Sequence, residues 1–575
     1  MDRELKSKNI GLRCQYKYIV YLICTVGICW IGVWRDIGTG AQWAFASNCV
    51  GFCLFPMILC KFSFKDFFRI PYAIWVVLFS IISVPLCREL LPGTDYDAQT
   101  ISAVAIVGLY GLVAIRLFFY IFVEDRFVKK DFSVVFWLWL GMMLFCCFSR
   151  NEAVWPFWYL VMFGAFYISP ASEKDLKEMI SGIIDGIIVS FFWVQIRAFL
   201  YRPYDTGAYY GHFTNNIING MFYTLSLSGI LTKLWMISKT DSIVGKRKKI
   251  FTLIFYVLSV SMLDFILFTG SRGAFMTALG MLGVYLIIDI LCFSKKKFRD
   301  ICIKGCIMVL VFSLMLYPVY ACIRYIPALR HHPVWYSDYS EEKVHSYDPI
   351  DSDKYTTFEQ ALDASGISRI YYMFVPKSND NTVSESTTSF LGRLGLFGLQ
   401  SGIITFPVLT PVKYQYYPGG IWVYEYDDGI EPGSDISHRA LVDVDLSQIK
   451  DMRLFIWKYF IERLNFWGHE ELYISAYVSD FYGHAHNSYL QMAYLFGIPV
   501  GIMFLVLCVW GIIKSFVAVL KHPNSNAYVF SLVFLTGYAL FGTIDCLVLT
   551  GEALYTLFFI CIGLIMRKNA SLTAK

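Results

Sequence analysis

The stretch FYGHAHNSYLQMAYLFGIPVGIMFL, residues 481–505, places a cluster of titratable side chains directly before a long apolar run. The cluster contains His484, His486 and Asn487. Histidine changes its protonation state near neutral pH, so it suits a general base that removes a proton from a hydroxyl group. Asn487 or Ser488 is also a good cap for a helix that begins here. A cap explains the asparagine and the serine but not the histidines, so we treat both histidines as candidate functional residues.

A metal site is the alternative interpretation of the same histidines. His484 and His486 form a His-x-His pair, and His469 and Glu470 in GHEEL would supply further ligands. Zinc sites use nitrogen and oxygen ligands of this kind. None of these spacings is diagnostic of a metal site, so we expect no bound metal.

A single arginine stands in a tight turn between two apolar runs, in the stretch LDFILFTGSRGAFMTALG. Arg272 is flanked by Gly270, Ser271 and Gly273, and small neighbours let a ligand approach the guanidinium and the N–H groups that begin the next helix. A helix start of this kind suits an anion. The plainer interpretation is an arginine that anchors the chain at the membrane surface. Asp264, about two helical turns deeper, is either a structural partner for a buried polar group or a functional residue.

A second arginine, Arg453, lies in the stretch SQIKDMRLFIWKYFIERLNFWG. Apolar residues recur there at helical spacing: Met452, Phe455, Ile456, Tyr459 and Phe460. This pattern predicts an amphipathic helix near 446–466 that lies along the outer membrane surface. An arginine is ordinary on such a helix, so the pattern alone assigns no function to Arg453.

The elements that must position these residues are membrane helices. Of the 575 residues, 57% are hydrophobic and 16% are charged, whereas soluble domains contain roughly 25% charged residues. Apolar runs long enough to cross a bilayer recur along the chain. We predict spans at about 18–34, 44–60, 71–87, 99–123, 132–148, 153–170, 179–199, 216–237, 250–269, 273–293, 301–320, 487–513, 525–545 and 550–566. The fold class is therefore an all-α polytopic membrane protein with about 12–14 transmembrane helices.

The basic residues predict the orientation of the chain. They gather in one set of alternate loops, including MDRELKSKNIGLRCQYK, SKTDSIVGKRKK and RKNASLTAK. The positive-inside rule makes these loops cytoplasmic, together with both termini. The net charge of +5 reflects this topology, and no basic patch interleaved with aromatic residues predicts nucleic-acid binding. The chain then divides into eleven spans in 1–320, a large extracytoplasmic loop domain in 321–486, and the last spans in 487–575.

The extracytoplasmic loop domain combines two kinds of sequence. Its first half includes SDYSEEKVHSYDPIDSDKYTTFEQ and KSNDNTVSESTTS, whose polar composition predicts a loose segment. Later, GGIWVYEYDDG alternates as a short strand pair does, and the amphipathic helix follows. We therefore expect this domain to be loose at its start and folded at its end.

Three stretches together resemble the O-antigen ligase and O-antigen polymerase superfamily of bacterial membrane glycosyltransferases. They are TGSRGAF after a span, RLFIWKYF followed by WGHEE late in a large outer loop, and GHAHNSYLQMAYLFGIP at the opening of a span. The resemblance covers roughly residues 185–565 and implies a GT-C-like arrangement of helices. Two features depart from it. The ligase-type Gly-x-x-Gly is replaced by Gly497 and Gly501, one residue further apart, and Gly-x-Gly before the histidines reads GHE. Residues 325–445 take no part in the resemblance.

The resemblance implies an enzyme that takes a glycan from undecaprenyl diphosphate and joins it to an acceptor hydroxyl on a glycan or a lipid. Arg272 and Arg453 would stabilise the departing diphosphate, because arginine binds phosphate through two N–H groups and stays charged. His486 would act as the general base, and Asn487 and His484 would bind substrate together with the arginines. No cofactor is expected. The enzyme would lie in the cell inner (plasma) membrane, act at its extracytoplasmic face and work with other polysaccharide-export proteins.

Two enzymatic activities and one transport activity fit this pattern. A polymerase joins one lipid-linked repeat unit to another, whereas a ligase moves the finished glycan onto a lipid or protein acceptor; the Gly501 departure and the large loop favour the polymerase. A transporter or flippase of lipid-linked oligosaccharides should instead show discontinuous helices and midplane charges in matching halves. The charges inside the predicted spans are scattered: Arg116, Asp185, Arg197 and Asp264. The scatter favours an enzyme.

Overall fold

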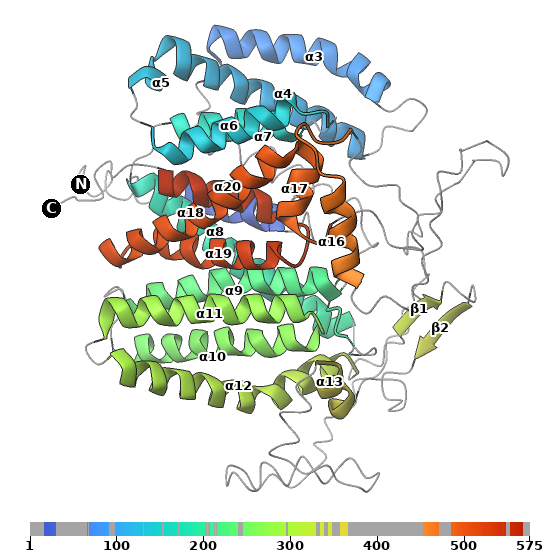
Figure 1. Cartoon of the computed structure of the whole chain (residues 1–575), viewed down its shortest axis with the longest axis vertical. Coiled ribbons are helices and arrows are strands. Elements are labelled where there is room, and N and C mark those ends of the chain that lie inside the picture. The colour runs from blue at the N-terminus through green and yellow to red at the C-terminus, as the bar shows by residue number, and fades with distance from the viewer. Residues whose placement is uncertain are drawn as a thin grey trace, which may run out of the picture.

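The computed structural model of the chain is built almost entirely of helices (Figure 1). It describes residues 17–29, 66, 68–90, 98–129, 132–151, 155–169, 173–201, 204, 208–211, 213, 216–239, 245–294, 297–328, 334–338, 343–347, 357–365, 452–470, 485–547 and 553–566. The predicted span 44–60 and the end of the span 18–34 lie outside these residues.

Most of the described helices lie in predicted apolar runs. They are Lys17–Cys29, α3 (Ile70–Leu90), α4 (Ala98–Phe118), η2 (Phe119–Val123), α5 (Arg126–Lys129), α6 (Val134–Phe148), α7 (Trp155–Ile168), α8 (Glu173–Tyr201), α9 (Asn216–Lys239), α10 (Lys246–Phe268), α11 (Arg272–Phe293), α12 (Lys297–Ala328), α13 (Phe358–Ser365), α16 (Met452–Glu462), α17 (Ser488–Phe496), α18 (Ile498–Lys521), α19 (Asn526–Gly542) and α20 (Ala553–Met566). Five of them, α8, α10, α11, α12 and α18, contain segments long and apolar enough to cross a membrane. Shorter apolar helices accompany them, as in a helical membrane protein.

The helices run side by side in a bundle (Figure 1). Helices α3 to α7 form one side, α8 and α17 to α20 lie in the middle, and α9 to α12 form the other side. The elements of the loop domain, α13, β1, β2 and α16, gather at one end of the bundle. We call this end the loop end, and it carries the candidate residues described below.

The predicted span 487–513 is wrong in one respect, because it is two helices. Helix α17 ends at Phe496, and α18 begins at Ile498. Gly497 between them has a φ of +101°, which residues with a side chain rarely adopt. A Cβ atom at Gly497 would lie 2.0 Å from the carbonyl oxygen of Phe466. The helix breaks here because another stretch of backbone crosses it in direct contact.

The crossing stretch follows α16, which is shorter than predicted. The helix expected near 446–466 is described over Met452–Glu462. It does not continue to 466 because the side chain of Asn465 accepts hydrogen bonds from the backbone N–H groups of Trp467 and Gly468, at 2.9 and 2.6 Å. The N–H of Ile498 donates to the carbonyl of Asn465 at 3.0 Å, which ties the stretch to the start of α18. In Figure 1, α16 runs across the end of the bundle and not along it.

The described part at the start of the loop domain is folded, contrary to the prediction of a loose segment. Strands β1 (Val334–Asp338) and β2 (Lys343–Tyr347) pair antiparallel, with Tyr336 opposite His345. The aromatic and β-branched residues of these strands favour extended structure despite the acidic surroundings. The prediction of an all-α fold is therefore corrected by this β-hairpin. The predicted strand pair GGIWVYEYDDG lies outside the described residues.

Helix α13 also belongs to the start of the loop domain. The ring of its first residue, Phe358, lies 5.4 Å from the ring of Tyr317 and 5.1 Å from that of Tyr320. Both tyrosines lie near the end of α12. The loop domain is therefore anchored on the bundle by aromatic packing at its beginning.

Candidate functional site

The turn between α10 and α11 presents Arg272 at the loop end. Gly270 has a φ of +70°, which glycine adopts without strain. Ser271 caps α11 by accepting a hydrogen bond from the N–H of Ala274 at 3.4 Å. Asn216, at the start of α9, donates from Nδ2 to the carbonyl of Thr269 at 2.9 Å. Within the described part of the chain, the exposed Arg272 side chain has no hydrogen bond or ion pair.

The small residues near Arg272 allow close packing between helices. A Cβ atom at Gly273 would lie 2.6 Å from Cγ2 of Ile544, and one at Gly220 would lie 2.8 Å from Cβ of Ala274. The first turns of α9 and α11 and the connection after α19 therefore meet with no room for additional atoms. The sequence suggested that small neighbours leave space for a ligand. Gly273 has a packing reason instead, so it is not evidence for a ligand.

His486 lies in a strained bend directly before α17. Its φ is +44°, a conformation that costs free energy in residues with a side chain and that occurs often at functional sites. Its side chain is 25% exposed, and Nδ1 lies 3.5 Å from Oδ1 of Asp545, whose side chain is 16% exposed. The imidazole therefore has a carboxylate on one side and access to solvent on another.

The predicted cap at the start of α17 is confirmed. The side-chain oxygen of Asn487 accepts hydrogen bonds from the N–H groups of Tyr489 and Leu490, both at 3.0 Å. Its Nδ2 donates to the carbonyl of Thr543 at 3.2 Å. Both polar atoms of Asn487 are engaged within the protein, and its expected contact with substrate stays a prediction.

The connection 543–547 between α19 and α20 joins the two motifs. Ile544 packs on Gly273, one residue after Arg272, and the next residue, Asp545, faces His486. The hydroxyl of Ser488 donates to the carbonyl of Asp545 at 3.0 Å. Arg272 and His486, far apart in the sequence, therefore flank one short segment at the loop end.

Asp545 is the residue that sequence reasoning missed. It is the last residue of the predicted span 525–545, an otherwise apolar run. A signal was present, because a carboxylate at the outer end of a span lies on the same face as His486. His486 and Asp545 are 59 residues apart, so the spans that carry them must be neighbours for the pairing, and the sequence alone does not specify which helices pack together.

Arg453 and His484 are less fully defined. Arg453 lies on α16, but its side chain is outside the described part, as is all of His484. Helix α16 rests on α17, where the ring of Phe460 lies 4.9 Å from that of Tyr494. The second arginine motif is thus carried by a helix that contacts the helix following His486.

His469, a ligand in the alternative metal interpretation, is engaged in packing. Its ring stacks on that of Tyr494 with centroids 3.8 Å apart, and its Nδ1 lies 2.8 Å from the carbonyl oxygen of Tyr494. The carbonyl of His469 accepts a hydrogen bond from Nδ2 of Asn151 at 2.9 Å. No three histidine, cysteine, aspartate or glutamate side chains come together to hold a metal ion in the regions that the structure describes, which exclude His484.

The charges within the helices differ in their surroundings. Asp185 is paired with Lys233 at 2.8 Å, and the guanidinium of Arg116 lies 4.6 Å from the ring centre of Tyr120. Asp264 is fully buried, and neither of its carboxylate oxygens has a hydrogen-bond partner among the described residues. The expected polar partner of Asp264 is therefore not found among them. Asp185 and Arg116 therefore have structural partners.

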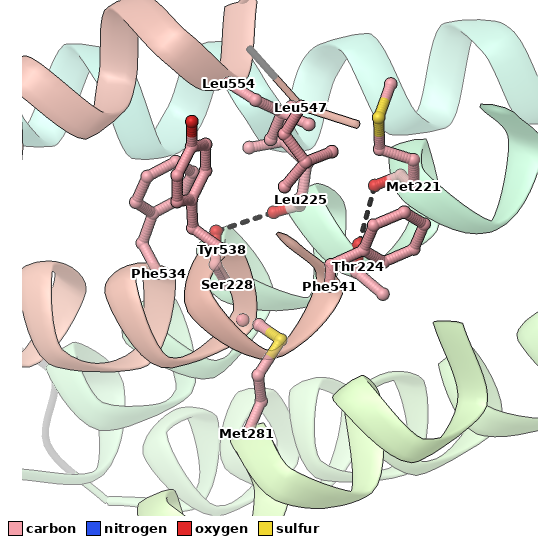
Figure 2. Close-up of a pocket in the computed structure, with 11 residues that line it drawn as sticks. Met221, Thr224, Leu225, Ser228, Met281, Phe534, Tyr538, Phe541, Leu547 and Leu554 are labelled. Atoms are coloured by element: carbon pink, nitrogen blue, oxygen red, sulfur yellow. Dashed lines mark hydrogen bonds between the residues drawn. The ribbon is translucent and has the colours of Figure 1, made fainter. Parts of the chain in front are cut away.

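A small pocket lies beneath the connection 543–547 (Figure 2). Its volume is about 10 Å³, and it is lined mainly by apolar groups, including Met221, Met281 and Phe541. The hydroxyl groups of Thr224 and Ser228 donate to carbonyls of their own helix, at 2.7 and 2.6 Å, as the dashed lines show. A space of this size holds about one water molecule, so the pocket is a packing gap and not a ligand site.

No family model matches the sequence, and neither a characterised protein nor a solved structure shows significant similarity to it. An exposed guanidinium can bind a phosphate group, and an imidazole beside a carboxylate can accept a proton from a hydroxyl group. Both lie at one end of an apolar helical bundle.

Proposed function

We propose that this protein is a metal-independent membrane glycosyltransferase that acts on glycans carried by undecaprenyl diphosphate. The observation that carries the proposal is the connection 543–547, which contacts the Arg272 turn through Ile544 and faces His486 through Asp545. A transfer from a lipid diphosphate needs a cation for the leaving group and a base for the acceptor hydroxyl. Both kinds of group occur here within one region.

The reaction follows from the chemistry of these groups. Asp545 holds the imidazole with its proton on Nδ1, so that Nε2 can take the proton from an acceptor sugar hydroxyl. The hydroxyl oxygen then forms a bond to the anomeric carbon of the donor glycan as the bond from that carbon to the diphosphate oxygen breaks. Negative charge grows on the diphosphate, and Arg272 stabilises it, with Arg453 as the proposed second cation. The products are the lengthened glycan and undecaprenyl diphosphate.

The apolar surroundings support a lipid-linked donor. Helices α10 and α11, which flank the Arg272 turn, are long and apolar enough to cross a membrane, so this turn would lie where the diphosphate of a lipid carrier meets the membrane surface. We place the protein in the cell inner membrane with about 12–14 spans, both termini in the cytoplasm, and the loop end on the extracytoplasmic face. Its partners would be the lipid-linked donor, a glycan or lipid acceptor, and other polysaccharide-export proteins.

We favour polymerisation of repeat units over ligation of finished glycan. The position of Gly501 bears on the choice, because a Cβ atom there would lie 2.5 Å from Cβ of Ala493, which gives this glycine a packing reason whatever the activity. The Gly-x-x-Gly departure therefore argues for a polymerase less strongly than the sequence alone suggested, and the large loop domain is the remaining support.

The experiment is to delete the gene and measure the size of the lipid-linked glycans that accumulate. Single repeat units would support the polymerase, and long unattached chains would support the ligase. Repeat units trapped on the cytoplasmic leaflet would indicate a flippase instead. Unchanged surface glycan would overturn all three.

The orientation can be tested separately with an impermeant thiol reagent on intact cells. Gln360 in α13 and Lys246 at the start of α10 are both exposed. In a chain with its native cysteines replaced, Gln360→Cys should be labelled and Lys246→Cys should not. Labelling at position 246 alone would reverse the orientation and place the site in the cytoplasm.

A further inference from the structure

The bend at His486 is held from both sides by hydrogen bonds. Its positive φ, shared in the described part of the chain only with Asp125 among residues other than glycine, persists only where the surroundings impose it. On the far side, Asn487 caps α17. On the near side, the N–H of Ala485 donates to Oε1 of Gln491 at 2.8 Å.

Gln491 is well placed to fix the entry of the chain into this bend. Both Ala485 and Gln491 are fully buried. The backbone N–H of Gln491 donates to the carbonyl of Asn487 at 2.9 Å. Gln491 therefore binds the residue before His486 through its side chain and the residue after His486 through its backbone. Loss of the side-chain bond would leave the buried N–H of Ala485 unsatisfied, which favours a different path for the backbone.

The amide nitrogen of Gln491, Nε2, is an independent observation. Its Nε2 is buried and has no hydrogen-bond partner among the described residues. An unsatisfied buried donor is unfavourable, and an apolar side chain of similar volume would avoid it. Within the described residues, only the acceptor Oε1 of the amide has a hydrogen-bond partner, and that partner is the N–H of Ala485, the residue before His486.

We propose that Gln491 is a positioning residue for His486. By holding the N–H of Ala485, it keeps the backbone of His486 left-handed and the imidazole beside Asp545. The expected effect of Gln491 on the rate rests on the proposed function. Its expected effect on the position of the imidazole does not.

The test compares Gln491→Met, which keeps the volume but loses the acceptor, with Gln491→Glu, which keeps an acceptor oxygen. In the purified full chain, Gln491→Met should lower kcat by about 10–100-fold while KM for the lipid-linked donor changes little, because misplacing a reacting group by about 1 Å is enough for such a loss. Gln491→Glu should recover most of this loss. Gln195→Met is the matched control, since Gln195 is also a buried glutamine in a helix. It should leave kcat near the wild-type value.

A second readout needs no enzymatic activity. Diethyl pyrocarbonate modifies histidine side chains, and mass spectrometry measures the extent of modification at His486 relative to that at His522. This ratio should change at least several-fold in Gln491→Met. If the wild type transfers no glycan, the proposed function fails while this measurement still decides the positioning role. If Gln491→Met does not accumulate, Ala485→Pro removes the donor of the same bond and should lower kcat likewise. Unchanged kcat and unchanged modification, or an equal loss in Gln195→Met, would overturn the proposal.

Discussion

Nδ1 of His486 lies 3.5 Å from Oδ1 of Asp545, across the start of α17. The two residues come from different helical connections, and two hydrogen bonds tie these connections to each other. The carbonyl of Asp545 accepts a hydrogen bond from the hydroxyl of Ser488, and Asn487 donates to the carbonyl of Thr543. Because these two hydrogen bonds hold the connections together, Asp545 is suited to orienting the imidazole of His486.

Replacing Asp545 with asparagine should lower the rate of glycan transfer by about 10²–10⁴-fold. The amide favours the wrong imidazole tautomer, and a loss of this size follows when a carboxylate that orients a catalytic histidine becomes an amide. Initial rates with a lipid-linked donor measure the effect. Asp300→Asn, at the start of α12, is the control and should keep the wild-type rate. Full activity of Asp545→Asn would remove Asp545 from the mechanism.

Replacing Arg272 with lysine should lower the rate by about one to three orders of magnitude, or about 1.5–4 kcal/mol of transition-state stabilisation. Lysine keeps the charge but loses the two parallel N–H groups that bind a phosphate. Arg150 is also exposed, and its backbone N–H donates to the carbonyl of Trp467, so Arg150→Lys is a control with the same change of side chain. Equal rates in the two variants would mean that Arg272 only anchors the chain.

Replacing Gly220 with alanine should destabilise the protein by about 1–3 kcal/mol, as overpacking does. The new Cβ would lie 2.8 Å from Cβ of Ala274 and 3.2 Å from Cβ of Ser271, and neither atom can rotate away. Gly283 in α11 has nothing within 4 Å of such an atom, so Gly283→Ala should be neutral or stabilising by up to about 1 kcal/mol. Thermal unfolding in detergent compares the two. A higher Tm for Gly220→Ala would contradict the close approach of α9 and α11.

The sequence predicted the helices well, because a run of about 20 apolar residues has few alternatives to a membrane helix. The cap at Asn487 and the exposed turn at Arg272 followed from local residue types. The break at Gly497 did not follow, because it depends on the backbone of Phe466, about thirty residues away. The end of α16 depends on the side chain of Asn465. Asp545 required knowledge of which helices are neighbours, and hydrophobic patterns do not contain that information.

Glycan transfer should continue in excess EDTA. If Arg272 and Arg453 neutralise the diphosphate, no divalent cation is needed for that charge. The measurement is the initial rate before and after removal of metal ions, with a metal-dependent glycosyltransferase as the positive control. Complete loss of activity, restored by one particular divalent ion, would favour the metal site formed by His484 and His486.

The most direct measurement of the central claim is the length of glycan made by the purified protein from undecaprenyl-diphosphate-linked repeat units. The wild type should convert single units into a ladder of longer chains. His486→Ala should slow this conversion by about 10²–10⁴-fold, the usual contribution of a general base, while it still binds the donor and accumulates normally; His484→Ala should be milder. A ladder formed by His486→Ala at the wild-type rate would contradict the assignment of the base. Failure of the folded wild-type protein to lengthen or transfer any lipid-linked glycan would contradict the function itself.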